Sequence, residues 1–343
     1  MKKILVALML GLLVLVGCSK VDKDVYTDSK VKEVVVQTTQ EEVANAVTEA
    51  TTETTEATVE ATTVATTASE TMTQYPLTMK DKFGNDIVIE SEPQKVISFS
   101  PELVEIMYAI DAGDKLIGRS QYCDYPAETA NVPEMGDLFN LNIETIVETA
   151  PDLVLLSSMA GQEVVDMLIS KGILVLTLDA DTDMEGVYTY VKALGKVLNR
   201  VPEAETLIID MEIQISQIEE KVKDLVKPSA YFIVGFGEYD SGATGDTFIN
   251  QLMELAGATN VAADGINWMY SVEQVVEKDP QILICSKFWD TKSTVSSEEG
   301  YKDLTAVKEN RLYEVDENIF FRQGPRMVEA IKVLAQIFHP EAF

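Results

Sequence analysis

Histidine is nearly absent from this sequence: His339, close to the C-terminus, is the only one among 343 residues. A catalytic triad or a cysteine–histidine pair therefore finds no histidine in the interior of the chain. The Gly-x-Ser-x-Gly elbow and the glycine-rich phosphate loop are also absent. Sites for bare zinc are normally rich in histidine. The sequence thus predicts a protein that is not an enzyme, with no catalytic residues, no metal site and no cofactor.

Positive charge is also scarce. Lysine and arginine number 27 against 57 aspartates and glutamates, which gives a formal net charge of −30 at pH 7. A nucleic-acid-binding protein needs basic side chains to neutralise phosphates, and this sequence has no basic stripe. We therefore expect no nucleic-acid partner. Cysteines number three, and the two outside the N-terminal segment, Cys123 and Cys285, are expected to be free thiols.

The first 18 residues have the pattern of an export signal. Two lysines precede an apolar run from Ile4 to Val16, which is too short for a stable membrane-spanning helix. The run ends in Leu15-Val16-Gly17-Cys18, which resembles the signal of bacterial lipoproteins, in which the cysteine becomes the lipidated N-terminus. Residues 1–18 are predicted to be a signal peptide. Acyl chains on Cys18 would then anchor the protein on the extracytoplasmic face of the cell membrane.

The segment that follows lacks the residues that build a core. Residues 37–74 contain no aromatic residue, glycine, proline, lysine or arginine and consist mainly of threonine, alanine and glutamate. Such a composition buries too little apolar surface to fold. We therefore predict a disordered tether over residues 19–74.

One long amphipathic helix organises the folded remainder. Between Val201 and Val226, apolar residues recur at steps of three and four, the spacing of one helix face. Pro228 ends the segment. The residues on this face are Ala204, Ile208, Met211, Ile215, Ile218, Val222 and Leu225.

The segments on either side of this helix resemble each other. Residues 142–155 and 271–284 both read as a capping residue, a short helix, a proline and an apolar strand, with Glu144 matching Glu273. Chance similarity is the alternative explanation. We favour an internal repeat, since a second pair of segments recurs in the same order.

Strands and helices alternate through both halves, which predicts parallel sheets covered on both faces. The expected fold is α/β, with two lobes of mainly parallel sheet bridged by one long rigid α-helix. The expected divisions are an N-terminal lobe at 75–183, linking helices at 184–227 and a C-terminal lobe at 228–343. Strands are expected at 95–99, 115–118, 152–156, 173–178, 230–235, 282–285 and 311–315, besides a hairpin at 78–89.

Several motifs occur in a characteristic order between residues 78 and 343. They include the segments Val96–Pro101, Tyr122–Pro126, Asn142–Glu144, Ser271–Glu273 and Arg322–Arg326. This order resembles the solute-binding proteins of ABC importers for iron chelates and cobalamin. The resemblance implies two α/β lobes joined by a long helix and a metal chelate bound reversibly between them. It also implies, as partner, an ABC permease dimer with its ATPase subunits.

Open α/β sheets bind ligands at loops that follow strands. The candidate ligand contacts on such loops are Tyr122, Phe139, Met159, Tyr239, Trp268, Trp289 and Arg322. Aromatic residues there suit a flat macrocycle or a catechol, whereas a core position is the alternative for each of them. Tyr122, Trp268 and Arg322 are favoured, because the resemblance implies ligand contacts near their loops. Met135 and Met159 are candidate ligands of haem iron, with core packing as the alternative.

Two departures from the family pattern bear on the ligand. Cobalamin-binding members tend to carry a tryptophan where this chain has Phe139, and an acid where Asn318 is the nearest equivalent. These departures favour a ferric siderophore over cobalamin, and Arg322 and Arg326 suit an anionic siderophore. Haem stays an alternative ligand. A lipid-anchored adhesin or sensor is the alternative function, and a surface hydrolase is less favoured.

Glu144 and Glu273 are predicted to dock on the permease. Each follows a capping residue in the first turn of a helix, where an acid also complements the helix dipole. The repeat places the two glutamates at equivalent points of two lobes, as a two-fold partner requires. The resemblance implies that such a pair binds arginines of the two permease subunits.

Overall fold

The computed structural model describes residues 72–178, 183–237 and 239–343. These ranges fall in one unit, Thr66–Phe343. The predicted signal peptide, Cys18 and the tether as far as residue 71 lie outside the described residues. Within the three ranges, no helix combines the length and the apolar character needed to span a bilayer.

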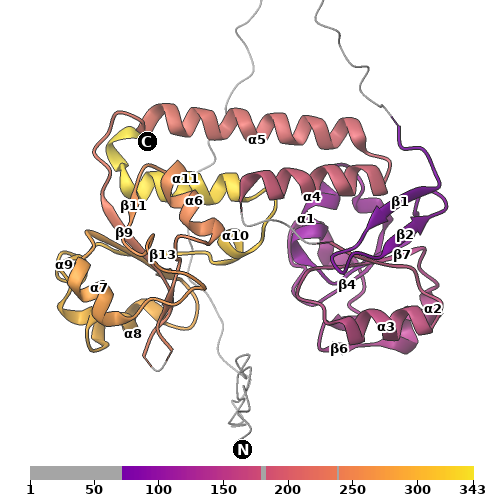
Figure 1. The fold of residues 1–343 in the computed structure, drawn as a ribbon, viewed down its shortest axis with the longest axis horizontal. Helices are drawn as coiled ribbons and strands as arrows, with labels where there is room; N and C mark the ends of the chain where they lie inside the picture. Colours follow the sequence, from indigo (N-terminus) through magenta and orange to yellow (C-terminus); the bar gives the residue numbers. More distant parts are fainter. Residues whose placement is uncertain (1–71, 179–182, 238) are drawn as a thin grey trace, which may run out of the picture. The chain divides into compact units, whose positions relative to one another are not determined.

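The first lobe contains a four-stranded parallel sheet of order β4-β3-β7-β8 (Figure 1). Its central strands are buried along their whole length, as expected where both faces are covered. Two antiparallel hairpins accompany it. The strands are β1 (Leu77–Lys80), β2 (Asp86–Ile89), β3 (Val96–Ser98), β4 (Leu116–Arg119), β5 (Gly136–Asp137), β6 (Asn140–Leu141), β7 (Leu153–Leu156) and β8 (Val175–Thr177). The helices are α1 (Pro101–Ala109), α2 (Ile143–Thr149) and α3 (Gln162–Ser170).

The second lobe repeats this plan with the order β10-β9-β12-β13 and with β11 also paired to β9. All its pairs are parallel except β9 with β10. The strands are β9 (Ser229–Gly235), β10 (Ser241–Gly242), β11 (Thr259–Asn260), β12 (Ile282–Ser286) and β13 (Leu312–Val315). The helices are α6 (Phe248–Leu255), α7 (Val272–Lys278), α8 (Thr291–Ser297), α9 (Thr305–Lys308), α10 (Asn318–Phe321) and α11 (Met327–Phe338).

The long helix α5 (Val201–Val222) runs above α4 (Met184–Val197) and α11, as Figure 1 shows. At 22 residues it is about 33 Å long. It ends four residues before the predicted Val226, because the chain turns at Val222–Leu225 ahead of Pro228. The predicted inward face is confirmed, since the six of its positions that lie within the helix are all buried. They are Ala204, Ile208, Met211, Ile215, Ile218 and Val222.

That buried face belongs to a core that both lobes share. One hydrophobic cluster includes Leu103 of α1, Val191 of α4, Phe232 of β9 and Ile331 of α11, together with the inward residues of α5. Two smaller clusters are confined to one lobe each. The helix is therefore packed along its length, which explains why it bridges the lobes as a stiff element.

The predicted repeat is confirmed at the level of secondary structure. Both α2 and α7 have seven residues, and a side chain caps each N-terminus, Asn142 in α2 and Ser271 in α7. Both end on a residue in the left-handed region, Ala150 at φ 48° and Asp279 at φ 40°. Each helix leads into an interior parallel strand of its sheet, β7 or β12. Glu144 and Glu273 thus occupy equivalent positions.

A polar cluster ties the first lobe to the turn between α4 and α5. Glu92 accepts hydrogen bonds from the buried Lys115 at 2.5 Å and from Asn199 at 2.8 Å. The Thr73 N–H donates to Asn199 Oδ1, and its hydroxyl donates to the Lys196 carbonyl. Thr73, which the predicted tether includes, is therefore held by the fold. The hydrogen bond from Lys115 is the largest cause that lowers the pKa of Glu92 to about 2.

Acid should therefore weaken the protein partly through Glu92. Its pKa is about 2 in the fold and about 4.5 when unperturbed, so its stabilising effect is complete above pH 4.5 and lost as the pH falls towards 2. We expect Glu92→Gln to lower the free energy of unfolding at pH 7 and to flatten its decline over that range. Urea unfolding between pH 7 and pH 2 measures both. Substitution of the exposed Glu90 by glutamine is the matched control. If the free energy of unfolding of Glu92→Gln falls with pH as steeply as that of the wild type, Glu92 does not contribute to acid sensitivity.

Candidate ligand-binding site

Arg322, one of the predicted ligand contacts, connects the two lobes. It follows α10 and is 9% exposed. Its Nη1 donates to Glu105 Oε1 at 3.0 Å and to Asp124 Oδ1 at 2.6 Å, both in the first lobe. Its Nη2 donates to the Tyr122 carbonyl and to Asn318 Oδ1, each at 3.1 Å. Burial acts to lower the pKa of Arg322, but the hydrogen bonds to Asp124 and Glu105 outweigh it and the pKa is raised.

Glu105 of α1 is the buried centre of this cluster. It is 3% exposed, and its carboxylate also accepts two hydrogen bonds from Arg326, at 2.5 and 2.9 Å. The Arg326 guanidinium lies 4.1 Å from the centre of the Tyr125 ring. A bidentate pair of hydrogen bonds of this kind is the strongest arrangement that an arginine and a carboxylate form. The sequence-based interpretation of Arg326, as a residue that suits an anionic siderophore, did not include this buried acid.

The sequence does carry a signal for Glu105 that the motif analysis missed. It lies between Val104 and Ile106 on a helix whose inward residues are otherwise apolar, and all three are buried. A buried carboxylate is stable only when it is paired. An acid within an apolar helix face therefore predicts a partner, but the identity of that partner depends on the second lobe, more than 200 residues along the chain.

Two predicted ligand contacts, Trp268 and Trp289, lie near Phe321, the residue before Arg322. The ring of Trp268 lies 6.1 Å from that of Phe321, the residue before Arg322. Phe321 and Trp289 line a cavity of about 240 Å3 that also includes Phe236, at the carboxyl ends of β9 and β12. Parallel α/β sheets place ligands at this end of their strands. Phe321, which is 40% exposed in the cavity wall, was not among the predicted contacts. It sits in an aromatic pair, Phe320-Phe321, whose pattern is typical of a core.

Other predicted contacts stand apart from this group. Phe139, Met159 and Tyr239 are 80%, 74% and 77% exposed on separate loops. Among the described residues, no ring contact or hydrogen bond joins their side chains to Arg322. Met135 is 2% exposed in the core of the first lobe, and a side chain at Gly118 would collide with its sulfur. The hypothesis that Met135 ligates haem iron is therefore wrong, whereas the exposed Met159 stays a prediction.

The two cysteines of the folded region are buried and free, as predicted. Burial raises the pKa of the Cys123 thiol to about 11 and that of Cys285 to about 12. Neither thiol is therefore ionised near neutral pH. In the part of the chain that the structure describes, no three histidine, cysteine or acidic side chains gather as metal ligands do.

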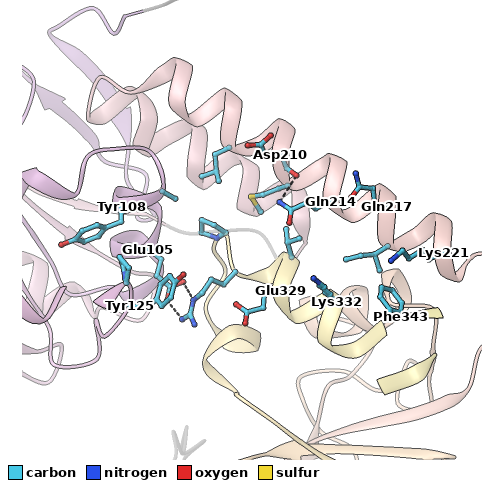
Figure 2. A pocket seen from close by; sticks show the side chains of 18 residues that line it. Glu105, Tyr108, Tyr125, Asp210, Gln214, Gln217, Lys221, Glu329, Lys332 and Phe343 are labelled. Atoms are coloured by element: carbon cyan, nitrogen blue, oxygen red, sulfur yellow. Dashed lines mark hydrogen bonds and ion pairs between the residues drawn. The ribbon is translucent and has the colours of Figure 1, made fainter. Parts of the chain in front are cut away.

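A larger cavity of about 640 Å3 lies between α1, α5 and α11 (Figure 2). Glu105 and Arg326 form part of its wall, and Lys221 lies over the ring of Phe343 at its other end. None of the seven predicted ligand contacts lines this cavity. The smaller cavity and Arg322 are therefore the candidate ligand site, because position at the strand ends is a better guide to ligand binding than volume.

Glu144 and Glu273 are exposed at the starts of α2 and α7. Hydrogen bonding to its own backbone N–H and to Ser271 lowers the pKa of Glu273. These contacts fit the helix-dipole interpretation, but they leave the carboxylate at the surface. Both glutamates are thus accessible to a partner.

Comparison with known proteins agrees with this geometry. The family model described as "Periplasmic binding protein" matches residues 96–319. The chain is 32% identical to an uncharacterized ABC transporter substrate-binding lipoprotein, YvrC, of Bacillus subtilis, over 78% of this chain and 87% of the relative. It is 28% identical to a cobalamin-binding protein of Halobacterium salinarum, over 77% and 74%. A possible iron-binding protein of Staphylococcus epidermidis has a similar structure, with a TM-score of 0.66, 26% identity and coverage of 72% and 99%.

Removal of the buried carboxylate should destabilise the protein strongly. Glu105→Ala leaves Arg322 and Arg326 without their shared partner, and breaking a buried ion pair from one side costs about 3–5 kcal/mol. We expect a loss of this size in the free energy of unfolding, measured in urea at pH 7. Glu329→Ala, an exposed change on α11, should cost less than about 0.5 kcal/mol. Equal effects of the two substitutions would show that the cluster does not hold the lobes together.

Proposed function

Because the chain belongs to the periplasmic binding protein family, we propose that it captures a metal chelate outside the cytoplasm and delivers it to an ABC permease dimer with its ATPase subunits. Members of this family bind solutes without transforming them, so the chain is not an enzyme. Lipid on Cys18 holds the protein at the cell membrane, and residues 19–71 act as the tether. Binding is reversible and leaves the chelate intact.

The arrangement around Arg322 is the observation that carries the proposal. Large aromatic side chains remain exposed at strand ends, where a folded protein has no packing use for them: Tyr122 is 56% exposed and Trp289 is 88% exposed. Exposed apolar groups that gather beside polar ones mark binding sites. The carbonyl of Tyr122 accepts a hydrogen bond from the Arg322 guanidinium, which also binds Asn318 of the second lobe, and Trp289 lines a cavity with the neighbouring Phe321.

The ligand contacts follow from this arrangement. Tyr122, Trp268, Trp289 and Arg322 form the central group, and the exposed Phe139, Met159 and Tyr239 complete the contacts from their loops. The aromatic faces pack against the chelator. The chelator supplies the ligands of the metal, so the protein requires no metal-binding side chains of its own.

A ferric siderophore fits this site better than cobalamin. The acid expected of cobalamin-binding members is replaced by Asn318, whose amide oxygen accepts a hydrogen bond from Arg322. The local charge is therefore less negative than an acid would make it, which favours an anionic chelate. Relatives named for cobalamin and for iron are both similar to this chain, and haem and cobalamin stay as alternative ligands.

Titration with chelates tests the binding function. The chain has two tryptophans, Trp268 and Trp289, so bound chelate should quench tryptophan fluorescence in a saturable way. We expect a ferric siderophore to bind more tightly than haem or cobalamin. Trp289→Leu should weaken binding about tenfold through loss of ring contact, while Phe83→Leu in the β1–β2 turn should change nothing. If no ferric siderophore, haem or cobalamin binds, the function proposed here is wrong and an adhesin or sensor becomes the leading candidate.

Glu144 and Glu273 are proposed to dock the loaded protein on the permease. They occupy equivalent positions of the repeated units, so the pair approximates the two-fold symmetry of a permease dimer. Charged groups at such an interface guide the encounter and set the register.

Charge reversal separates docking from ligand binding. The double variant Glu144→Lys and Glu273→Lys should reduce uptake by cells at least about tenfold, because each lysine repels a permease arginine. Chelate affinity of the purified protein should be unchanged. The control reverses Glu212 and Glu219, two exposed acids on α5, which adds the same charge away from α2 and α7 (Figure 1). Docking is misassigned if the double variant transports normally or if its affinity for chelate falls.

A further inference from the structure

We propose that Asp124 occupies the anion position of the ligand site, and that an anionic oxygen of the chelate replaces it on Arg322. The inference rests on the proposed function and names the chemical class of the ligand. That class is a metal chelate with a peripheral carboxylate or catecholate oxygen. Asp124 is then a residue that determines specificity, because it competes with such ligands for one guanidinium.

The two acids bound to Arg322 differ sharply in accessibility. The Glu105 side chain is 1% exposed and binds Arg326 as well as Arg322. The Asp124 side chain is 59% exposed, and its ion pair with Arg322 at 2.6 Å lies at the surface of the cluster. Breaking a buried ion pair is costly, whereas an exposed pair contributes little to stability. Asp124 is therefore the partner that an incoming anion displaces.

The place of this ion pair links it to the ligand contacts. Asp124 follows Tyr122 in the loop after β4, and the Tyr122 carbonyl accepts a hydrogen bond from the same guanidinium. On the other side, Arg322 follows Phe321, which lines the aromatic cavity together with Trp289. A chelate packed against those rings reaches Arg322 through an oxygen at its edge. At Arg322 this oxygen meets the carboxylate group of Asp124.

Charge determines which chelates gain from the exchange. Glu105, Asp124, Arg322 and Arg326 together carry no net charge, so an anion added beside them is repelled by Asp124 unless that side chain moves away. A chelate with an anionic oxygen replaces the charge it displaces. A neutral chelate offers no replacement and leaves the pair intact. Glu105 holds Arg322 in both cases, so the lobes stay connected while the outer partner changes.

The variant Asp124→Asn removes the competing charge and keeps the shape of the side chain. The probes are a negatively charged ferric tris-catecholate and a neutral ferric tris-hydroxamate, titrated into the wild-type protein and the variant. We expect the variant to bind the tris-catecholate about fivefold more tightly, the ratio that corresponds to about 1 kcal/mol for an ion pair with one exposed partner. Its affinity for the tris-hydroxamate should not change. Urea unfolding of the variant checks that it is folded.

The chain contains a closely matched control. Glu134 pairs with the buried Arg119 at 3.1 Å, and the two side chains are 57% and 9% exposed, against 59% and 10% for Asp124 and Arg322. Glu134→Gln therefore removes an equivalent charge from an equivalent pair and should alter neither affinity.

A change of both affinities by Asp124→Asn, or of neither, would overturn the exchange. If the wild-type protein binds the tris-catecholate and the variant binds it no better, the exchange alone fails. If the wild-type protein binds neither chelate and also binds neither haem nor cobalamin, the proposed function fails with it.

Discussion

The buried face of α5 is the constraint on which the rest of the structure depends. Its inward residues belong to the one hydrophobic cluster that continues into both lobes, whereas the cluster that is particular to each lobe does not reach the helix. A helix held along its length by packing bends little. The lobes are therefore kept at a nearly constant separation, and a rigid ligand such as a metal chelate suits a site of this kind.

The polar contacts between the lobes also constrain how the lobes are oriented, which the hydrophobic packing alone does not. Packing of apolar side chains is not directional, whereas the fork between Glu105 and Arg326 fixes both distance and angle. Arg322 extends the same cluster to the surface, because it binds the buried Glu105 on one side and the exposed Asp124 on the other. One pair of neighbouring arginines thus supports the fold on its inner side and presents charge on its outer side.

The repeat gives each lobe an equivalent helix–strand unit, whereas the loops around Arg322 occur only once. The units α2–β7 and α7–β12 share their caps, length and strand position, and each presents a glutamate at the surface. The loops around Arg322 have no such symmetry, because an aromatic cavity lies on the second lobe and acids on the first. This division suits a protein that contacts a symmetric partner through its two repeated units and an asymmetric ligand through the loops around Arg322.

The sequence by itself determined the local elements. The spacing of apolar residues identified the inward face of α5, and caps and prolines bounded α2 and α7, because these signals act within a few residues of one another. Only the tertiary structure decided which side chains meet. The sequence assigned Arg322 and Arg326 to an anionic ligand, but it did not show that both also bind Glu105 from the other lobe, or that Met135 lies in the core. Contacts across two hundred residues depend on how the lobes pack, and no local pattern encodes that.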